Sequence, residues 1–325
     1  MKSLVFLVLA LATFALRVPI AYASFLNFQN LVVFGDSLSD NGNTFSAAGL
    51  PKAPYYNGRW TNGPNWVDRF SQFARITDVT AFLQNRGTNF AVGGSTSLDL
   101  AGQIGVYLGD NGGQADPTDL YVVWIGANDF QAGLTPQQTV ATIEAEVVTL
   151  GRAGVKYLLL LTVPDISLTP NLIASGGARV LAAKQFVATV NSTFQAQMPI
   201  YAMALGINLK LVDVNPLFTQ LVYDPSAFGF ANSVGAAYNV NSGTVVPNPD
   251  KYVFWDGFHP TTSVHYLIAQ LIYQSATALS ASPKAAPLLS SIAAPKGVRS
   301  RCRCQTFGHV RQSSRHPGTG QPLSC

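Results

Sequence analysis

The sequence predicts an α/β fold, a three-layer αβα sandwich built around a mainly parallel sheet of five strands. Short apolar runs alternate along the chain with segments of helical periodicity. The runs are apolar at consecutive positions, which is typical of strands covered by helices on both faces. In addition, polar residues of catalytic types follow several of these runs, and ligands of such folds bind beyond the carboxyl ends of the strands.

The five expected strands are recognised by their apolar residues and by the glycine or proline that ends most of them. They cover residues 31–34, 88–92, 120–125, 155–163 and 208–214. The helical periods predict four helices, over residues 64–74, 136–153, 177–205 and 263–279. The second helix has the clearest boundaries, because Thr135 can cap it, Pro136 suits its first turn and Gly154 can end it.

Two segments do not follow this alternation. Residues 224–250 are rich in glycine, asparagine, serine and aromatic residues, so we expect a long surface loop that helps to shape an apolar pocket. Residues 284–325 contain seven basic residues and no acidic residue, and they show no periodicity. We therefore expect a disordered basic tail there.

The N-terminus has the pattern of a secretory signal peptide over residues 1–23. Lys2 precedes an apolar run at residues 4–16, and Ala21-Tyr22-Ala23 fits a cleavage site with small residues. An uncleaved anchor is the alternative, but the run is shorter than the roughly 20 residues that span a bilayer. We therefore expect the folded domain over residues 24–283, in a protein that is secreted, periplasmic or held at the cell surface.

The charge is unevenly distributed along the chain. The formal net charge is +4, yet residues 24–283 contain 11 basic and all 16 acidic residues and are therefore acidic overall. This balance gives no support to nucleic-acid binding. The three cysteines, Cys302, Cys304 and Cys325, all lie in the tail, so the main domain has no cysteine nucleophile, disulfide or thiolate metal site.

Only two of the four histidines, His259 and His265, lie in the expected folded region. Asp256 precedes His259 by three residues in a turn marked by glycine and proline, so its carboxylate can reach the imidazole and fix its tautomer. His265 has no acidic residue nearby in sequence. A hydrogen bond that merely stabilises the loop is the alternative role for Asp256 and His259.

Ser37 directly follows the first strand, where a helix could begin. A serine at that position has a free backbone N–H, and helix N-termini favour negative charge, so both would help to stabilise an oxyanion. Helix capping is the alternative role. The surrounding residues do not form the G-x-S-x-G motif, because Ser39 stands where that motif requires glycine.

Two further strand ends could contribute donors to an oxyanion. The pair Gly93 and Gly94 can present backbone N–H groups without steric obstruction, and the side-chain amide of Asn128 can donate as well. Each of these could equally be part of an ordinary turn.

Taken together, these residues resemble the four signature blocks of the GDSL, or SGNH, hydrolase family. The blocks are residues 34–43 (FGDSLSDNGN), 89–95 (NFAVGGS), 126–129 (GAND) and 255–261 (WDGFHPT). Residues 229–232 (GFAN) are also similar to the family's loop before the last block. The resemblance covers most of residues 31–280 and implies the flavodoxin-like SGNH fold; the tail after Pro283 matches nothing in the family.

The resemblance implies a role for each candidate residue. Ser37 would be the nucleophile, His259 the base and Asp256 the residue that orients the base. The oxyanion hole would consist of the N–H of Ser37, the amide of Asn128 and the N–H of a glycine, either Gly93 or Gly94, of which we favour Gly94. No cofactor or metal is implied.

The expected reaction is the hydrolysis of a carboxylic ester of the esterase or lipase type through an acyl-enzyme. The expected partner is a small-molecule or lipid ester and no nucleic acid; contact with a membrane or cell surface is left open, and we expect a monomer. Two alternatives stay open: a phospholipase or acyltransferase on the same fold, and a binding protein without catalysis.

Overall fold

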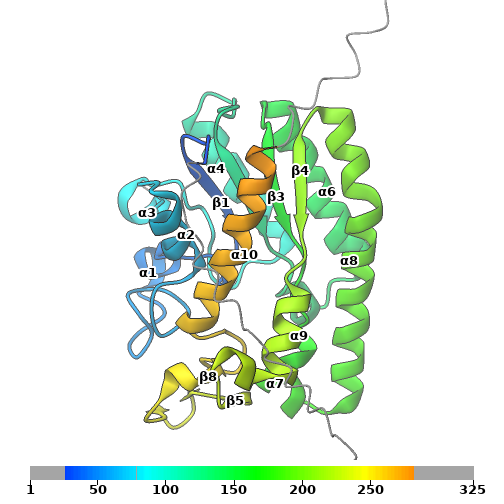
Figure 1. Cartoon of the computed structure of the whole chain (residues 1–325). Helices are drawn as coiled ribbons and strands as arrows, with labels where there is room; N and C mark the ends of the chain where they lie inside the picture. The colour runs from blue at the N-terminus through cyan, green and yellow to red at the C-terminus, as the bar shows by residue number, and fades with distance from the viewer. Residues whose placement is uncertain (1–25, 78, 282–325) are drawn as a thin grey trace, which may run out of the picture. The chain divides into compact units, whose positions relative to one another are not determined.

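A parallel sheet forms the centre of the structure, which is a computed structural model that describes residues 26–77 and 79–281 (Figure 1). The four strands are β1 (Leu31–Gly35), β2 (Leu120–Trp124), β3 (Tyr157–Leu161) and β4 (Asn208–Val212), in that spatial order. All three neighbouring pairs are parallel, and Leu31 pairs with Leu120 at the start of the register. The predicted α/β fold class is therefore confirmed.

Helices cover both faces of the sheet, and the strand side chains alternate between two buried clusters. One cluster joins alternate strand residues to α2 (Trp66–Ala74), α9 (Asn215–Tyr223) and α10 (Thr262–Ser280). The other joins the remaining strand residues to α4 (Leu100–Asp110), α6 (Pro136–Ala153) and α8 (Gly177–Leu205). These three layers explain why the strands are apolar at consecutive positions.

The fifth expected strand, residues 88–92, is an extended edge segment and not a strand. It runs beside β1, where Asn89 forms an isolated parallel bridge to Val33, and the backbone N–H of Phe90 donates to the carbonyl of Val33. Its position next to β1 completes the strand order of flavodoxin-like sheets. The regular ladder is interrupted where the backbone N–H of Gly35 donates to the side-chain oxygen of Gln103.

The helix boundaries follow the signals in the sequence. Helix α6 begins after Thr135, whose side chain accepts the N–H of Gln138, and ends at Gly154, which adopts a left-handed conformation. Helix α2 begins two residues later than predicted because Asn65 caps it in a capping box with Asp68. No helix of the described residues is long and apolar enough to cross a membrane.

Residues 224–250 were expected to be a surface loop, but they contain short regular elements. Strand β5 (Asn232–Ala236) pairs with β8 (Tyr252–Phe254), and β6 (Tyr238–Asn239) forms a hairpin with β7 (Thr244–Val245). The remaining short elements are α1 (Asn43–Ala48), α3 (Phe82–Asn85), α5 (Asp129–Ala132), α7 (Pro170–Ala174) and the 3₁₀ turns Ser97–Asp99, Ile166–Leu168, Pro225–Phe228 and Pro249–Lys251.

Two sequence expectations lie outside the described residues. These are the signal peptide over residues 1–23 and the basic tail over residues 284–325 with its three cysteines. Both therefore stay predictions.

Candidate active site

Ser37 lies in a tight turn directly after β1. The backbone N–H groups of Ser39 and Asp40 both donate to the carbonyl of Asp36, and the carboxylate of Asp36 accepts the N–H of Leu38. Helix α1 begins only at Asn43, so the expected helix start at Ser37 is not present. The turn itself exposes the serine at the carboxyl end of the strand.

His259 and Asp256 lie in the turn between β8 and α10. The carboxylate of Asp256 accepts the backbone N–H groups of Phe258 and His259, at 2.8 and 2.7 Å. Its other oxygen lies 2.8 Å from Nδ1 of the His259 ring. These bonds fix the ring so that Nε2 points away from the carboxylate.

The turn that carries Ser37 and the turn that carries His259 meet beyond the carboxyl end of β1. Nε2 of His259 lies 2.9 Å from Oγ of Ser37, across 222 residues of sequence. A hydrogen-bonded chain therefore runs from Ser37 through His259 to Asp256. This is the geometry in which an imidazole can take the proton of a hydroxyl while a carboxylate orients it.

The other histidine of the folded region, His265, takes no part in this chain. It is buried in α10, and its Nδ1 has no hydrogen-bond partner among the residues that the structure describes. Burial lowers the pKa of His265 to about 3, so the ring is neutral.

The electrostatics of the site keep Asp256 ionised. Burial alone acts to raise the pKa of its carboxyl, but the charge of His259, the hydrogen bonds from that residue and one from Tyr55 outweigh burial and hold the pKa at about 2. In turn, burial acts to lower the pKa of His259, and the carboxylate of Asp256 more than compensates, so the pKa of the ring is raised. Burial also raises the pKa of Asp36 to about 7.

The donors that could face an oxyanion differ in their availability. The N–H of Gly93 already donates to Asp40 and to the hydroxyl of Thr44, at 2.9 and 2.7 Å. The N–H groups of Ser37 and Gly94 have no hydrogen-bond partner within residues 26–77 and 79–281. The geometry thus favours Gly94 over Gly93 as a free donor.

Asn128 is held in place by Ser95, a residue of the second signature block. One N–H of its side-chain amide donates to the carbonyl of Ser95 at 2.8 Å, and the amide lines the same cavity as Ser37 and Gly94. The bond to Ser95 leaves the second N–H of the amide for a ligand.

A cavity of about 470 Å³ opens beside Ser37 and His259. Its lining is largely apolar and includes Leu38, Pro164, Ile166, Phe218, Phe254 and Phe258. No residue of the segment 224–250 lines it, which corrects the expectation that this segment shapes the pocket. That segment instead packs behind the site, where Tyr238 stacks on Trp255 with ring centroids 5.4 Å apart.

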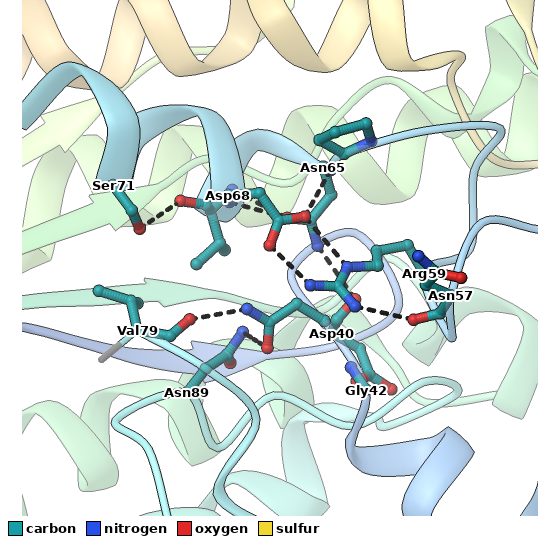
Figure 2. A network of polar contacts seen from close by, with 12 residues as sticks. Asp40, Gly42, Asn57, Arg59, Asn65, Asp68, Ser71, Val79 and Asn89 are labelled. Atoms are coloured by element: carbon teal, nitrogen blue, oxygen red, sulfur yellow. Dashed lines mark hydrogen bonds and ion pairs between the residues drawn. The ribbon is translucent and has the colours of Figure 1, made fainter. Parts of the chain in front are cut away.

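A polar network fixes the loop of residues 36–42, which carries Ser37 (Figure 2). The side-chain amide of Asn65 donates to the carbonyl of Asp40, while Asp68 of the same capping box binds Arg59 through two hydrogen bonds. The network thus connects three segments: residues 36–42, the start of α2 and residues 57–59.

The sequence did not indicate two aromatic residues that contact the site, Tyr55 and Trp60. Oη of Tyr55 donates to Asp256 at 2.6 Å, and the ring of Trp60 lies 5.5 Å from that of His259, tilted by 33°. The segment around Tyr55 and Trp60 has no periodicity, and the residues that these two contact, Asp256 and His259, lie about 200 positions later in the sequence. Only its richness in aromatic residues between two signature blocks could have suggested a role.

Comparison with known families gives a match to the family described as GDSL-like Lipase/Acylhydrolase, over residues 31–272. The match covers well over half of the chain and contains all four signature blocks. The chain belongs to the GDSL-like lipase/acylhydrolase family. Membership of the GDSL family supports an ester-hydrolysing enzyme.

Several curated proteins are similar to this GDSL-family chain. The thermolabile hemolysin of Vibrio parahaemolyticus is 27% identical, with 77% of this chain and 64% of that protein covered. Lipase 1 of Photorhabdus luminescens is also 27% identical, with 75% and 49% covered. The phosphatidylcholine-sterol acyltransferase of Aeromonas hydrophila is 24% identical, with 90% and 86% covered. The chain thus spans 64% and 49% of the length of the first two relatives.

Among solved structures, a G-D-S-L family protein of Veillonella parvula is 16% identical. The similarity covers 75% of this chain and 96% of that one, with a TM-score of 0.45.

Proposed function

We propose that this chain hydrolyses carboxylic esters through an acyl-enzyme formed on Ser37. The observation that supports this most is the hydrogen-bonded chain of Ser37, His259 and Asp256, which opens onto an apolar cavity. A bond that served only to stabilise the loop would not require a serine hydroxyl 222 residues away at hydrogen-bonding distance from the imidazole.

In the first half of the reaction, Oγ of Ser37 attacks the ester carbonyl while Nε2 of His259 takes the hydroxyl proton. Asp256 stabilises the resulting imidazolium. The negative oxygen of the tetrahedral intermediate accepts hydrogen bonds from the N–H groups of Ser37 and Gly94 and from the amide of Asn128. His259 then gives its proton to the leaving alcohol.

In the second half, a water molecule attacks the acyl-Ser37 carbonyl and His259 again takes a proton. The same three donors stabilise the second intermediate, and the acid leaves as Ser37 regains its proton. Removing one such donor typically reduces kcat by about 10²- to 10³-fold. No cofactor or metal ion enters this scheme.

The cavity supports uncharged acyl groups as substrates. Its lining consists mainly of apolar side chains, and its charged or titratable members are Asp165 and His259. A carboxylate on the acyl chain would meet the negative charge of Asp165 among largely apolar side chains. We therefore propose apolar acyl esters, including lipid esters.

A series of p-nitrophenyl esters of increasing acyl length tests this function. With esters whose deacylation is the slower step we expect a burst of nitrophenolate, because acylation releases nitrophenolate first, and Ser37→Ala should abolish the activity. The matched control is Ser46→Ala, at an exposed serine in α1. Hydrolysis by folded Ser37→Ala at the wild-type rate would contradict the proposal, and no turnover of any ester by the wild type would favour a binding protein.

An acyltransferase is a second candidate, supported by the similarity to the acyltransferase of Aeromonas hydrophila. The two activities share the acyl-enzyme and differ only in whether water or an alcohol accepts the acyl group. Product analysis with an added long-chain alcohol distinguishes them: an ester product that outweighs the free acid indicates transfer.

We also propose that the protein is exported after removal of residues 1–23. The basic Lys2, the apolar run and the small residues at positions 21 and 23 support this. The N-terminal residue of protein recovered outside the cytoplasm tests the proposal: it should be Ser24, and an N-terminus at residue 1 would contradict it.

A further inference from the structure

The carboxylate of Asp256 has a hydrogen-bond donor from a distant part of the chain. Oη of Tyr55 lies 2.6 Å from Oδ2 of Asp256, across 201 residues of sequence. Nδ1 of His259 lies 2.8 Å from Oδ2 and 3.0 Å from Oδ1, and Oδ1 also accepts the two backbone N–H groups of its own turn. Tyr55 and His259 therefore share one oxygen of the carboxylate.

Tyr55 keeps the proton that it donates. Burial, the negative charge of Asp256 and the hydrogen bond to it all raise the pKa of this phenol above its ordinary value. The hydroxyl is therefore neutral around pH 7 and can donate to the carboxylate.

The ring of Tyr55 is fixed by other aromatic residues. Its centroid lies 5.9 Å from that of Trp60, 5.6 Å from that of Tyr238 and 6.1 Å from that of Trp255, each in an edge-to-face arrangement. Such contacts stabilise a definite ring orientation. Because Trp60 also packs against His259, one segment of chain contacts both members of the acid–base pair.

The loop that carries Tyr55 is itself anchored. Arg59 binds Asp68 through two hydrogen bonds and also donates to the carbonyl of Asn57 (Figure 2). The backbone N–H of Tyr56 donates to the carbonyl of Thr61, which closes the loop on itself. These bonds restrain the loop and thereby keep the hydroxyl of Tyr55 close to the carboxylate of Asp256.

We propose that Tyr55 is a positioning residue of the active site, which fixes Oδ2 of Asp256 and through it the orientation and basicity of His259. This inference rests on the proposed function. A hydrogen bond from Tyr55 withdraws negative charge from the oxygen that His259 also uses. The tyrosine thereby moderates the stabilisation of the imidazolium while it restrains the carboxylate that orients the ring.

Several other charged or titratable groups act on these residues. Asp36 acts on His259 from the nucleophile turn, and His265 lies close enough in α10 to be influenced by the charge of His259. Tyr238 acts on Tyr55 from the β6 hairpin. None of these groups is changed when only the hydroxyl of Tyr55 is removed.

The test is the pair Tyr55→Phe and Tyr56→Phe, assayed with a p-nitrophenyl ester across pH. Removing the Tyr55 hydroxyl returns negative charge to Oδ2, so we expect the acid limb of kcat/KM to move to higher pH. We also expect kcat to fall about tenfold, as when an outer-shell partner of a site is lost. Tyr56→Phe, at an exposed ring in the same loop, should leave both unchanged.

A second readout does not depend on catalysis. The pKa of His259, followed by NMR of its ring, should be higher in Tyr55→Phe than in the wild type. An unmoved pKa, or a rate reduced equally at every pH, would overturn the positioning role even if the wild type is an active esterase. If the pKa of His259 is higher in Tyr55→Phe but the wild type turns over no ester, the proposed function is contradicted and the effect of Tyr55 on His259 is still supported.

Discussion

Two opposing effects act on the imidazole of His259. Burial disfavours its charged form and lowers its pKa, whereas the carboxylate of Asp256 and, more weakly, that of Asp36 favour the charged form. The carboxylates prevail, so the pKa of the ring is raised above the ordinary value of 6.5. A general base works only when it is neutral, so this shift determines where activity begins on the pH scale.

We therefore expect kcat/KM of the wild type to increase with pH, with a midpoint above 6.5. In Asp256→Asn the attraction is gone and burial remains, so the midpoint should move to lower pH. The activity of Asp256→Asn should also fall about 10³- to 10⁴-fold, because the amide no longer fixes the required tautomer. Pre-steady-state acylation rates across pH measure both, and a midpoint that does not respond to Asp256→Asn would contradict this account of the pair.

At the scale of elements, one residue at the start of α2 both stabilises that helix and contacts the loop that carries Ser37. The side-chain oxygen of Asn65 accepts the N–H groups of Val67 and Asp68, and its amide donates to the carbonyl of Asp40 in the nucleophile loop. A cap of this kind contributes about 1 kcal/mol to stability. Here the same side chain also restrains the loop that carries Ser37.

Asn65→Ala should thus lower the free energy of unfolding by about 1–2 kcal/mol and reduce esterase activity in the folded state. The matched control is Thr135→Ala, which removes the cap of α6 without touching the nucleophile loop. Urea unfolding should show a comparable loss for both variants. If activity at a temperature where both are folded were equal in the two, the link between α2 and the nucleophile loop would be refuted.

The elements that could be predicted from the sequence are those with local signals. The boundaries of α6 follow from Thr135, Pro136 and Gly154, and the sheet follows from its apolar runs. Residues 88–92 were predicted as a strand that ends at Gly93 and Gly94, and they do run beside β1, but the ladder is interrupted where the N–H of Gly35 donates to the side chain of Gln103. A local pattern does not reveal such a distant partner.

Local sequence patterns also failed to reveal those site residues whose partners are distant in sequence. The signature blocks indicated Ser37, Asp256 and His259, and the structure brings all three side chains together. Tyr55 was missed because its role depends on a contact across 201 residues, which tertiary folding alone determines. The free N–H that distinguishes Gly94 from Gly93 also depends on distant partners, namely Asp40 and Thr44.

At the scale of the whole described unit, the fold brings the site residues together from distant parts of the sequence. Helices on both faces bury the sheet, and the loops at the carboxyl ends of its strands are the place where residues far apart in sequence can meet. Ser37 follows β1, Asn128 follows β2 and His259 precedes the last helix. An intact fold is therefore needed to activate the serine.

Covalent labelling with a fluorophosphonate probe, followed by mass spectrometry of the peptides, tests this claim most directly. The account predicts one adduct, on Ser37, that forms in the folded wild type and is lost in His259→Ala and after unfolding in urea. An adduct on another serine, or labelling of Ser37 that persists without His259, would contradict it.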